Sequence, residues 1–300
     1  MTISITSILV GLIFILNMAF AAVVIFLERK DAGATWAWLL VLFFIPVLGF
    51  IMYMLFGQNL TRSKMFQWED QKKIGIAQLV SKQMMSISAR QFPYQNKVEK
   101  NYHDLIYMNL IHNDSVLTQD NDVEIFTDGK DKFNALLKDM EQAKDHIHLQ
   151  YYIFKKDNIG KKILELLIRK AKEGVKVRVL YDDLGSRKMT RRFFQELRKA
   201  GGEVEAFFPS KFHIINLRLN YRNHRKLAII DGKIGYIGGF NVGDEYLGLN
   251  PRFGYWRDTH LRITGSAVLE IQTRFILDWN QASHRHNIQY SSNYFPTPPP

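Results

Sequence analysis

The chain has 300 residues, with 40 lysines and arginines against 29 aspartates and glutamates, and a formal net charge of +11. No residue is cysteine, which excludes disulfides, thiolate metal sites and cysteine nucleophiles. The length suits one sizeable domain with appendages or two modest domains, and the basic excess indicates an anionic partner, either nucleic acid or an acidic membrane surface.

Two apolar segments open the chain, and each is long enough to cross a bilayer. No charged residue occurs from Met1 to Leu27 or from Ala32 to Thr61, and a short charged stretch separates the two segments. A helix needs about 20 apolar residues to span the hydrocarbon core. Pro46 and Gly49 would kink the second helix, which a membrane span tolerates. The sequence therefore predicts two transmembrane helices that form a hairpin over residues 1–61.

The alternative for the first segment is a cleaved secretory signal. No basic residue precedes it, and the apolar run continues past the small residues Ala19 and Ala21, so an uncleaved span is favoured. Between Arg62 and Lys100 there are eight lysines and arginines against three acidic residues. Because basic flanks stay on the cytoplasmic side, the sequence predicts a multi-pass protein of the cell membrane with the residues after 61 in the cytoplasm.

Residues 62–120 form a basic connector. Its segment from Met65 to Gln91 mixes lysines and an arginine with spaced apolar residues. A cationic amphipathic helix lying on anionic headgroups has this pattern, and so has an ordinary helix packed on the following domain. Both interpretations remain open at this point.

Alternating strands and helices follow over residues 121–290. The pattern predicts strands over 123–127, 146–154, 175–181, 204–208, 227–231, 234–237 and 256–263, and helices over 133–140, 163–171, 191–200 and 267–283. This alternation is typical of an α/β fold, a mixed sheet with helices on both faces. Asp231 and Gly232 predict a hairpin turn. Residues 291–300 are an irregular, proline-rich tail.

The segment that runs from His224 to Asn241 carries the chemistry, with the spacing H-x-K-x4-D-x6-G-G-x-N. His224 and Lys226 lie two residues apart, so on a strand they share one face. The two glycines, Gly239 among them, let backbone N–H groups approach an anion. Lys226 and Asn241 match the oxygens of a phosphoryl group, which leaves His224 as nucleophile or general acid. The alternative is a solvated, basic strand edge, but the full spacing favours a phosphodiester site.

This segment, together with Leu149-Gln150-Tyr151-Tyr152 and Trp256-Arg257-Asp258-Thr259-His260, resembles the bacterial cardiolipin synthases of the phospholipase D superfamily. The resemblance covers nearly the whole chain. It implies transfer of a phosphatidyl group between two phosphatidylglycerol molecules, which gives cardiolipin and glycerol through a phosphatidyl-histidine, with no metal or other cofactor.

The same resemblance implies roles for individual residues. His224 is nucleophile or acid, and Lys226, Gly239 and Asn241 bind the phosphate. Asp258 is expected to orient the imidazole. Asp231 belongs to the same catalytic set, where it is expected to secure the turn rather than to touch substrate.

The family has two such motifs per chain, whereas this sequence has one. Of its nine histidines, only His224 has a lysine two residues later. His284 and His286 lack a supporting carboxylate cluster, which predicts a solvated helix end and no metal site. Either the chain is the N-terminal half of a longer protein, or two copies pair. The proline-rich end favours truncation, and a half that cannot borrow a second histidine is expected to be nearly inactive.

Two other functions compete with lipid transfer. From Arg187 to Lys226 there are eleven lysines and arginines against three glutamates, as in a nucleic-acid-binding protein, so a dimeric nuclease of the same superfamily is one alternative. A membrane-anchored module without turnover is the other. The two predicted spans and the basic cytoplasmic face favour anionic lipid headgroups, and no nucleic acid is expected. The resemblance implies phosphatidylglycerol and a second motif-bearing half as partners.

Overall fold

The structure is a computed structural model of the chain. It describes residues 11–16, 19, 21, 32–53, 76–95, 97–187, 189–190, 192–207, 209, 222–283, 286–289 and 291–296. The chain divides into two compact units, Met1–Phe66 with Ser210–Arg222 and Gln67–Pro209 with Asn223–Pro300. The second unit contains every residue predicted for the phosphodiester site.

In the first unit, the apolar segment around Pro46 forms two helices, α2 (Ala32–Phe44) and α3 (Pro46–Met52), where one kinked helix was expected. Ile45 has φ −132° and ψ 67°, outside the helical region, because a following proline ring disfavours the α conformation. The two helices pack closely, since a Cβ on Gly49 would lie 2.7 Å from the carbonyl oxygen of Val41. The proline therefore divides the segment instead of merely bending it.

Within the described residues, no helix is both long enough and apolar enough to cross a bilayer. The 13 residues of α2 extend about 20 Å at 1.5 Å per residue, which is less than the roughly 30 Å of a hydrocarbon core. Much of the first predicted segment and the end of the second lie outside the described residues. The two membrane spans therefore stay predictions.

The described residues of the connector include the helices α6 (Ile76–Ser88), α7 (Lys97–Asn101) and α8 (His103–Asn113). Val80 and Ile87 of α6 are buried against Leu110 of α8 in a small core of their own. The side chain of Gln83 also holds α6 in place, since it donates to the carbonyl of Leu117 at 3.0 Å and accepts from its N–H at 2.6 Å. One face of α6 is thus occupied by protein, and its predicted contact with headgroups remains untested.

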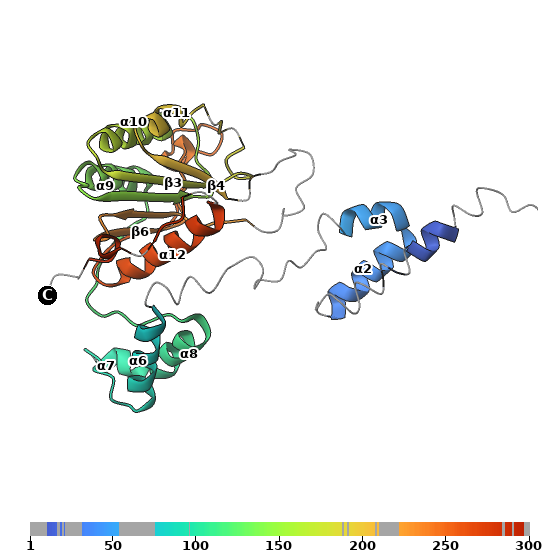
Figure 1. Cartoon of the computed structure of the whole chain (residues 1–300), viewed down its shortest axis with the longest axis horizontal. Helices are drawn as coiled ribbons and strands as arrows, with labels where there is room; N and C mark the ends of the chain where they lie inside the picture. Colours follow the sequence, from blue (N-terminus) through green and yellow to red (C-terminus); the bar gives the residue numbers. More distant parts are fainter. Residues whose placement is uncertain are drawn as a thin grey trace, which may run out of the picture. The chain divides into compact units, whose positions relative to one another are not determined.

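Seven strands form one mixed sheet in the order β1-β7-β6-β5-β2-β3-β4 (Figure 1). The strands are β1 (Asp122–Phe126), β2 (His146–Tyr151), β3 (Lys176–Asp182), β4 (Glu203–Phe207), β5 (Leu227–Ile230), β6 (Ile234–Gly238) and β7 (His260–Thr264). Strands β2, β3 and β4 are parallel, whereas each adjacent pair from β2 through β5, β6 and β7 to β1 is antiparallel. The predicted α/β class with a mixed sheet is confirmed.

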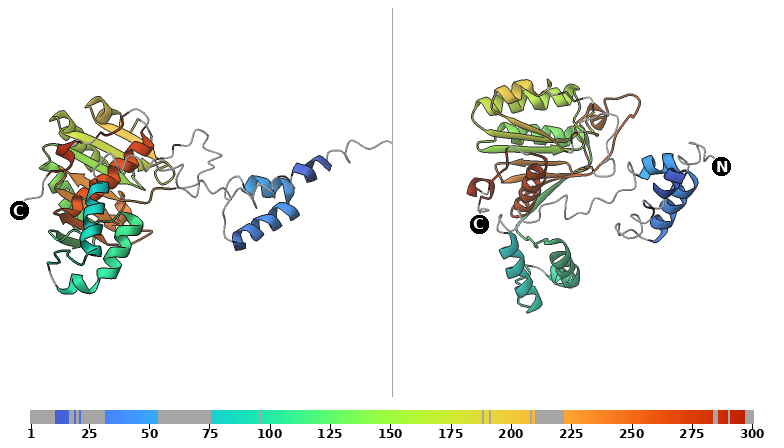
Figure 2. Two further views of the ribbon diagram at one scale, coloured as in Figure 1. Left: turned by 60° about the horizontal axis from the view of Figure 1, so that its bottom comes forward. Right: turned by 45° about the vertical axis from the view of Figure 1, so that its right-hand side comes forward.

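Helices cover both faces of the sheet (Figures 1 and 2). Helices α9 (Gly129–Glu141), α10 (Asn158–Lys172) and α11 (Gln195–Lys199) pack on one face, and α12 (Ala267–Ala282) packs on the other. The main core lies under the first group, where strand residues such as Leu149 and Val179 are fully buried. On the opposite face, His146 and His148 hydrogen-bond to Gln272 of α12, so both histidines have structural partners in the packing between strand and helix.

Strand β7 begins later than the sequence pattern indicates. The predicted strand starts at Trp256, whereas β7 starts at His260. Both neighbouring strands end at this level, since Gly238 of β6 and Phe126 of β1 each pair with His260. Residues 256–259 have no strand to pair with there, so they are free to form the loop that carries Asp258.

The β5–β6 hairpin turns at Asp231 and Gly232, whose φ angles are 54° and 64°. Left-handed conformations of this kind are what an Asp-Gly turn supplies. The Asp231 carboxylate also accepts hydrogen bonds from the backbone N–H groups of Lys144, Asp145 and His146, at 2.8 to 2.9 Å. It therefore fastens the hairpin to the start of β2, at the end of β5 opposite His224.

We expect Asp231→Asn to lower the free energy of unfolding by about 2 kcal/mol, because the amide replaces a charged acceptor of three backbone hydrogen bonds. Denaturant unfolding of the full chain in detergent, followed by tryptophan fluorescence, measures this loss. Glu124→Gln on the exposed face of edge strand β1 is the control and should change stability by less than about 0.5 kcal/mol. Equal stability of the two variants would contradict the bracing role of Asp231.

Candidate active site

His224 and Lys226 lie just before β5, beside the residue that follows β2. Because β5 is antiparallel to β2, the start of β5 meets the end of β2. The His224 imidazole is exposed and stacks on the ring of Tyr152, with centroids 3.8 Å apart and planes 20° apart. The Lys226 ammonium lies 5.6 Å from the centre of the same ring and donates a 2.6 Å hydrogen bond to the carbonyl of His224. The predicted histidine and lysine are thus brought together.

Asp258 lies near Lys226. Burial lowers the pKa of the Lys226 ammonium below its ordinary value, and the negative charge of Asp258 partly offsets this lowering. The Asp258 carboxylate accepts a 2.7 Å hydrogen bond from the N–H of Thr259. Among the described residues, no hydrogen bond joins Asp258 to His224. The expected orientation of the imidazole by Asp258 therefore remains a prediction, while its electrostatic effect on Lys226 follows from the geometry.

Gly239 permits Asp258 to approach the backbone. A Cβ at position 239 would lie 1.9 Å from the Oδ1 atom of Asp258, so any side chain there would displace the carboxylate. The Gly239 N–H donates to the carbonyl of Thr259 at 2.8 Å. In this structure the glycine therefore serves the packing of the 256–259 loop, and its predicted contact with phosphate is an additional, untested role.

Asn241 is buried and bonded at both ends of its amide. Its Oδ1 atom accepts from the N–H of Ile153 at 3.0 Å, and its Nδ2 atom donates to the hydroxyl of Tyr246 at 2.8 Å. Because an amide nitrogen carries two hydrogens, one N–H of Asn241 remains for a ligand. The bond to Ile153 also links the glycine turn to the chain segment that carries Tyr152.

A fully buried carboxylate, Asp278 of α12, organises the backbone under the site. It accepts hydrogen bonds from Gln150 at 2.7 Å, Asn223 at 2.8 Å, Arg225 at 2.9 Å and Arg274 at 2.5 Å. A buried charge is tolerated only when it is paired and hydrogen-bonded, as it is here. The sequence analysis missed Asp278, although an acidic residue between two large apolar neighbours in a closing helix was a usable signal.

A buried polar group lies on the α9 face of the sheet. Lys132 donates to the hydroxyl of Tyr151 at 2.9 Å, and burial lowers the pKa of its ammonium well below the ordinary value.

The buried histidines of the sheet do not offer a second imidazole to the site. Burial, with the nearby charges of Lys132 and Lys226, lowers the pKa of His260 to about 2. His146, His148 and His260 are all fully buried, so none of these three can supply a second imidazole to a phosphodiester at His224.

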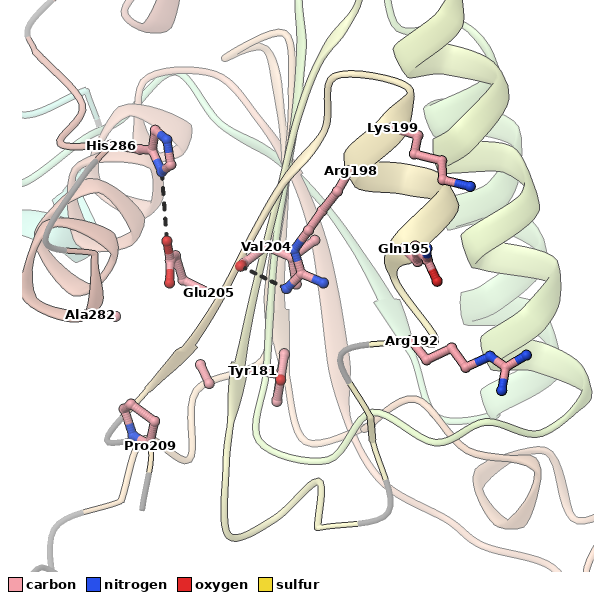
Figure 3. A pocket seen from close by; sticks show the side chains of 11 residues that line it. Tyr181, Arg192, Gln195, Arg198, Lys199, Val204, Glu205, Pro209, Ala282 and His286 are labelled. Carbon is pink, nitrogen blue, oxygen red and sulfur yellow. Dashed lines mark hydrogen bonds and ion pairs between the residues drawn. The ribbon is translucent and has the colours of Figure 1, made fainter. Parts of the chain in front are cut away.

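A groove of about 1050 Å³ lies elsewhere on the unit, between α11, strand β4 and the end of α12 (Figure 3). Arg192, Arg198 and Lys199 line one side, and His286 pairs with Glu205 at 3.7 Å on the other. None of its lining residues belongs to the His224–Asn241 segment.

The histidine pair near the end of the chain was expected not to bind metal. His286 contacts the Glu205 carboxylate, while His284 lies outside the described residues. No group of three possible metal ligands occurs in the described parts of the chain.

Two family descriptions match the chain. Residues 136–267 match "Cardiolipin synthase, PLD-like domain", and residues 15–58 match "Phospholipase_D-nuclease N-terminal". The first match spans β2 to the start of α12 and includes His224, Lys226, Asn241 and Asp258. The second covers the latter part of the first apolar segment and most of the second.

Curated relatives have high sequence identity to the chain. It is 65% identical over 293 residues to the major cardiolipin synthase ClsA of Bacillus subtilis, a match that covers 98% of this chain and 61% of that protein. It is 56% identical over 289 residues to a cardiolipin synthase of Listeria monocytogenes, with 96% and 60% covered. The chain thus spans about 60% of the length of these relatives.

Solved structures resemble the chain more remotely. NucT from Helicobacter pylori aligns with 54% of this chain and 98% of its own, at 19% identity and a TM-score of 0.42. The PLD-like match includes the whole segment from His224 to Asn241. The chain belongs to the phospholipase D superfamily, and it carries the PLD-like domain of the cardiolipin synthases.

Proposed function

We propose that the chain supplies one half of a metal-independent phosphatidyl-transfer site of the cardiolipin synthase type. The observation that carries the proposal is the convergence of His224, Lys226 and Asn241 at the junction of β2, β5 and β6, where one imidazole is exposed beside an ammonium and an amide N–H. The names of relatives that are 56% and 65% identical support lipid transfer over other phosphodiester chemistry.

The reaction proceeds in two displacements. A nitrogen of the neutral His224 imidazole attacks the phosphorus of one phosphatidylglycerol, the P–O bond to the headgroup glycerol breaks, and an acid outside this half-site protonates the leaving oxygen. A hydroxyl of a second phosphatidylglycerol then attacks the same phosphorus and loses its proton to the same group. The P–N bond breaks, its electron pair returns to the imidazole, and cardiolipin and glycerol are released. His224 can equally serve as the acid when the partner motif supplies the nucleophile.

Lys226 and Asn241 bind the phosphate in this scheme. The ammonium attracts the anionic oxygens, and the remaining N–H of Asn241 donates to one of them. The negative charge of Asp258 raises the pKa of Lys226 against the effect of burial and so favours its ammonium form. Gly239 leaves the space that Asp258 occupies and offers a backbone approach to the ligand.

The site needs a second imidazole to protonate the leaving glycerol. The part of the relatives that lies beyond the matched 61% is one source, and a second copy of this chain is the other. A module that binds lipid without turnover is the outcome if neither is supplied. The apolar segments in residues 1–61 would hold the site at the membrane, with the catalytic unit on the cytoplasmic face and phosphatidylglycerol within reach.

A nuclease of the same superfamily is the competing function, and the basic run from Arg187 to Lys226 is the observation that favours it. The two functions differ in substrate, so phosphatidylglycerol vesicles and single-stranded DNA offered to the same preparation separate them. Cleavage of DNA without release of glycerol from the vesicles would favour the nuclease.

We expect cardiolipin to form when the full chain is reconstituted in phosphatidylglycerol vesicles with the part of the Bacillus subtilis relative outside the matched region. His224→Asn should lower the rate by at least about 10³-fold, because the nucleophile or acid is lost. Mass spectrometry of the lipids and measurement of released glycerol follow the reaction. His112→Asn, on the exposed end of α8, is the control and should keep the wild-type rate. Full activity of His224→Asn would exclude His224 from the chemistry.

Affinity for phosphatidylglycerol should fall as pH rises through the lowered pKa of Lys226, because only the ammonium form attracts the phosphodiester. Asp258→Asn removes the charge that raises this pKa, so the loss of affinity should move to lower pH. The dependence of KM on pH in the reconstituted system measures both effects. Glu124→Gln removes a remote surface charge and should leave the profile in place; an unchanged profile in Asp258→Asn would contradict the coupling.

A further inference from the structure

We infer that Tyr152 is the positioning residue for His224: its ring fixes the plane of the imidazole and stabilises the positive charge that the imidazole acquires during transfer. The inference rests on the proposed function of the site. The two rings are nearly parallel and 3.8 Å apart between centroids, close enough for full face-to-face contact. An orienting carboxylate was expected beside the imidazole; in this structure the neighbour that orients the imidazole is instead the stacked ring of Tyr152.

A stacked neighbour constrains an imidazole differently from a carboxylate. A carboxylate occupies one ring nitrogen, whereas a stacked ring restricts the tilt of the plane and leaves both nitrogens at the open edge. Among the described contacts of His224, none engages a ring nitrogen, and the side chain is exposed. Both ring nitrogens therefore remain open to a ligand, and the plane in which they lie is set by Tyr152.

Gly185 lies against the Tyr152 ring. A Cβ at position 185 would lie 2.9 Å from two carbons of the ring and 2.3 Å from the Tyr152 carbonyl oxygen. Only a residue without a side chain lets the ring lie flat against the backbone there. The Tyr152 carbonyl also accepts a 3.1 Å hydrogen bond from the hydroxyl of Ser186. Gly185 and His224 thus both contact the Tyr152 ring.

One carboxylate, that of Asp182, holds the backbone at Gly185 and next to His224. Oδ1 of Asp182 accepts from the N–H groups of Leu184 and Gly185, at 2.9 and 3.2 Å. Its Oδ2 accepts from the N–H of Asn223, the residue before His224, at 3.1 Å. Asp182 is almost fully buried at the end of β3, so the two backbone segments on either side of this contact are anchored to the core of the domain.

The charge of the reaction gives the stack a second effect. When the imidazole attacks phosphorus, or when it is protonated, the ring becomes cationic, and the electron-rich face of Tyr152 attracts it. The Lys226 ammonium lies 5.6 Å from the centre of the same tyrosine ring, so two cations of the site share one aromatic face. No proton or bond passes through Tyr152. Its aromatic ring is required and its hydroxyl is not, which distinguishes positioning from acid–base catalysis.

The variants that separate these properties are Tyr152→Phe, which keeps the ring, and Tyr152→Leu, which keeps an apolar side chain without it. Gly185→Ala retains Tyr152 but pushes its ring aside. Tyr102→Leu, on the exposed stretch before α8, is the matched control for loss of a tyrosine. Thermal unfolding of each full-length variant reports whether the fold is intact.

The first measurement is the NMR spectrum of the full chain in detergent, with ring-labelled histidine and the His224 signal identified by its absence in His224→Asn. The stacked tyrosine should displace this signal upfield in the wild type, Tyr152→Phe and Tyr102→Leu. The displacement should be lost in Tyr152→Leu and in Gly185→Ala. This readout requires no turnover, so an inactive wild type would count against the proposed function alone. An upfield His224 signal that persists in Tyr152→Leu would overturn the inference.

The second measurement is phosphatidyl transfer in the reconstituted system. Tyr152→Leu and Gly185→Ala should lose about 10- to 100-fold in kcat, as a misplaced catalytic group does, with KM changed less than about twofold. Tyr152→Phe should restore kcat to within about twofold of the wild type. A rise in KM with unchanged kcat in Tyr152→Leu would mean that Tyr152 binds lipid and does not position His224, and would falsify the proposed role. Loss of activity in Tyr152→Phe equal to that in Tyr152→Leu would do the same.

Discussion

The arrangement of the whole site depends on one constraint, the need to satisfy the carboxylate of Asp278 in the interior of the domain. A buried charge without partners would cost several kcal/mol, so the chain must bring donors to it. It does so with Gln150, Asn223, Arg225 and Arg274, which come from three different segments. Two of these donors flank His224 directly. The helix that closes the domain thereby determines where the catalytic segment lies.

The strand order then decides which side chains meet. Strands β2, β3 and β4 are parallel, and β5 enters beside β2 in the opposite direction. The end of β2 and the start of β5 therefore lie side by side, so that Tyr152 faces His224. The same arrangement places the hairpin at the other end of β5, where Asp231 fastens it to the start of β2. Strand β5 thus separates His224, just before the strand, from Asp231, just after it.

The proposed half-site would need a partner, although this chain already holds the first imidazole with several of its own residues. The residues that hold the exposed imidazole come from this half: Tyr152 stacks on it, and Asp182 and Asp278 fix the backbone before it. The three fully buried histidines are committed to the interior. What this half does not offer is a second exposed imidazole opposite His224 among its described residues.

Much of the site was predictable because residues close together in the sequence encode it. The spacing from His224 to Asn241, the alternation of strands and helices, and the Asp-Gly turn are properties of short windows, and periodicity determines them before any tertiary contact forms. The mixed sheet was predictable for the same reason. By contrast, the apolar segment around Pro46 was expected to form one helix, and it forms two, because packing between Gly49 and Val41 adds to the effect of the proline.

The sequence by itself determined which residue types carry the chemistry and in what order they occur. Only the tertiary structure decided that Asp258 acts on Lys226, that Tyr152 covers His224, and that Asp278 and Asp182 hold the backbone beneath them. These contacts join residues far apart in the chain. They depend on strand order, on the paths of the loops and on which donors the fold brings to each carboxylate. Local periodicity encodes which face of an element is buried, but not which distant side chain that face will meet.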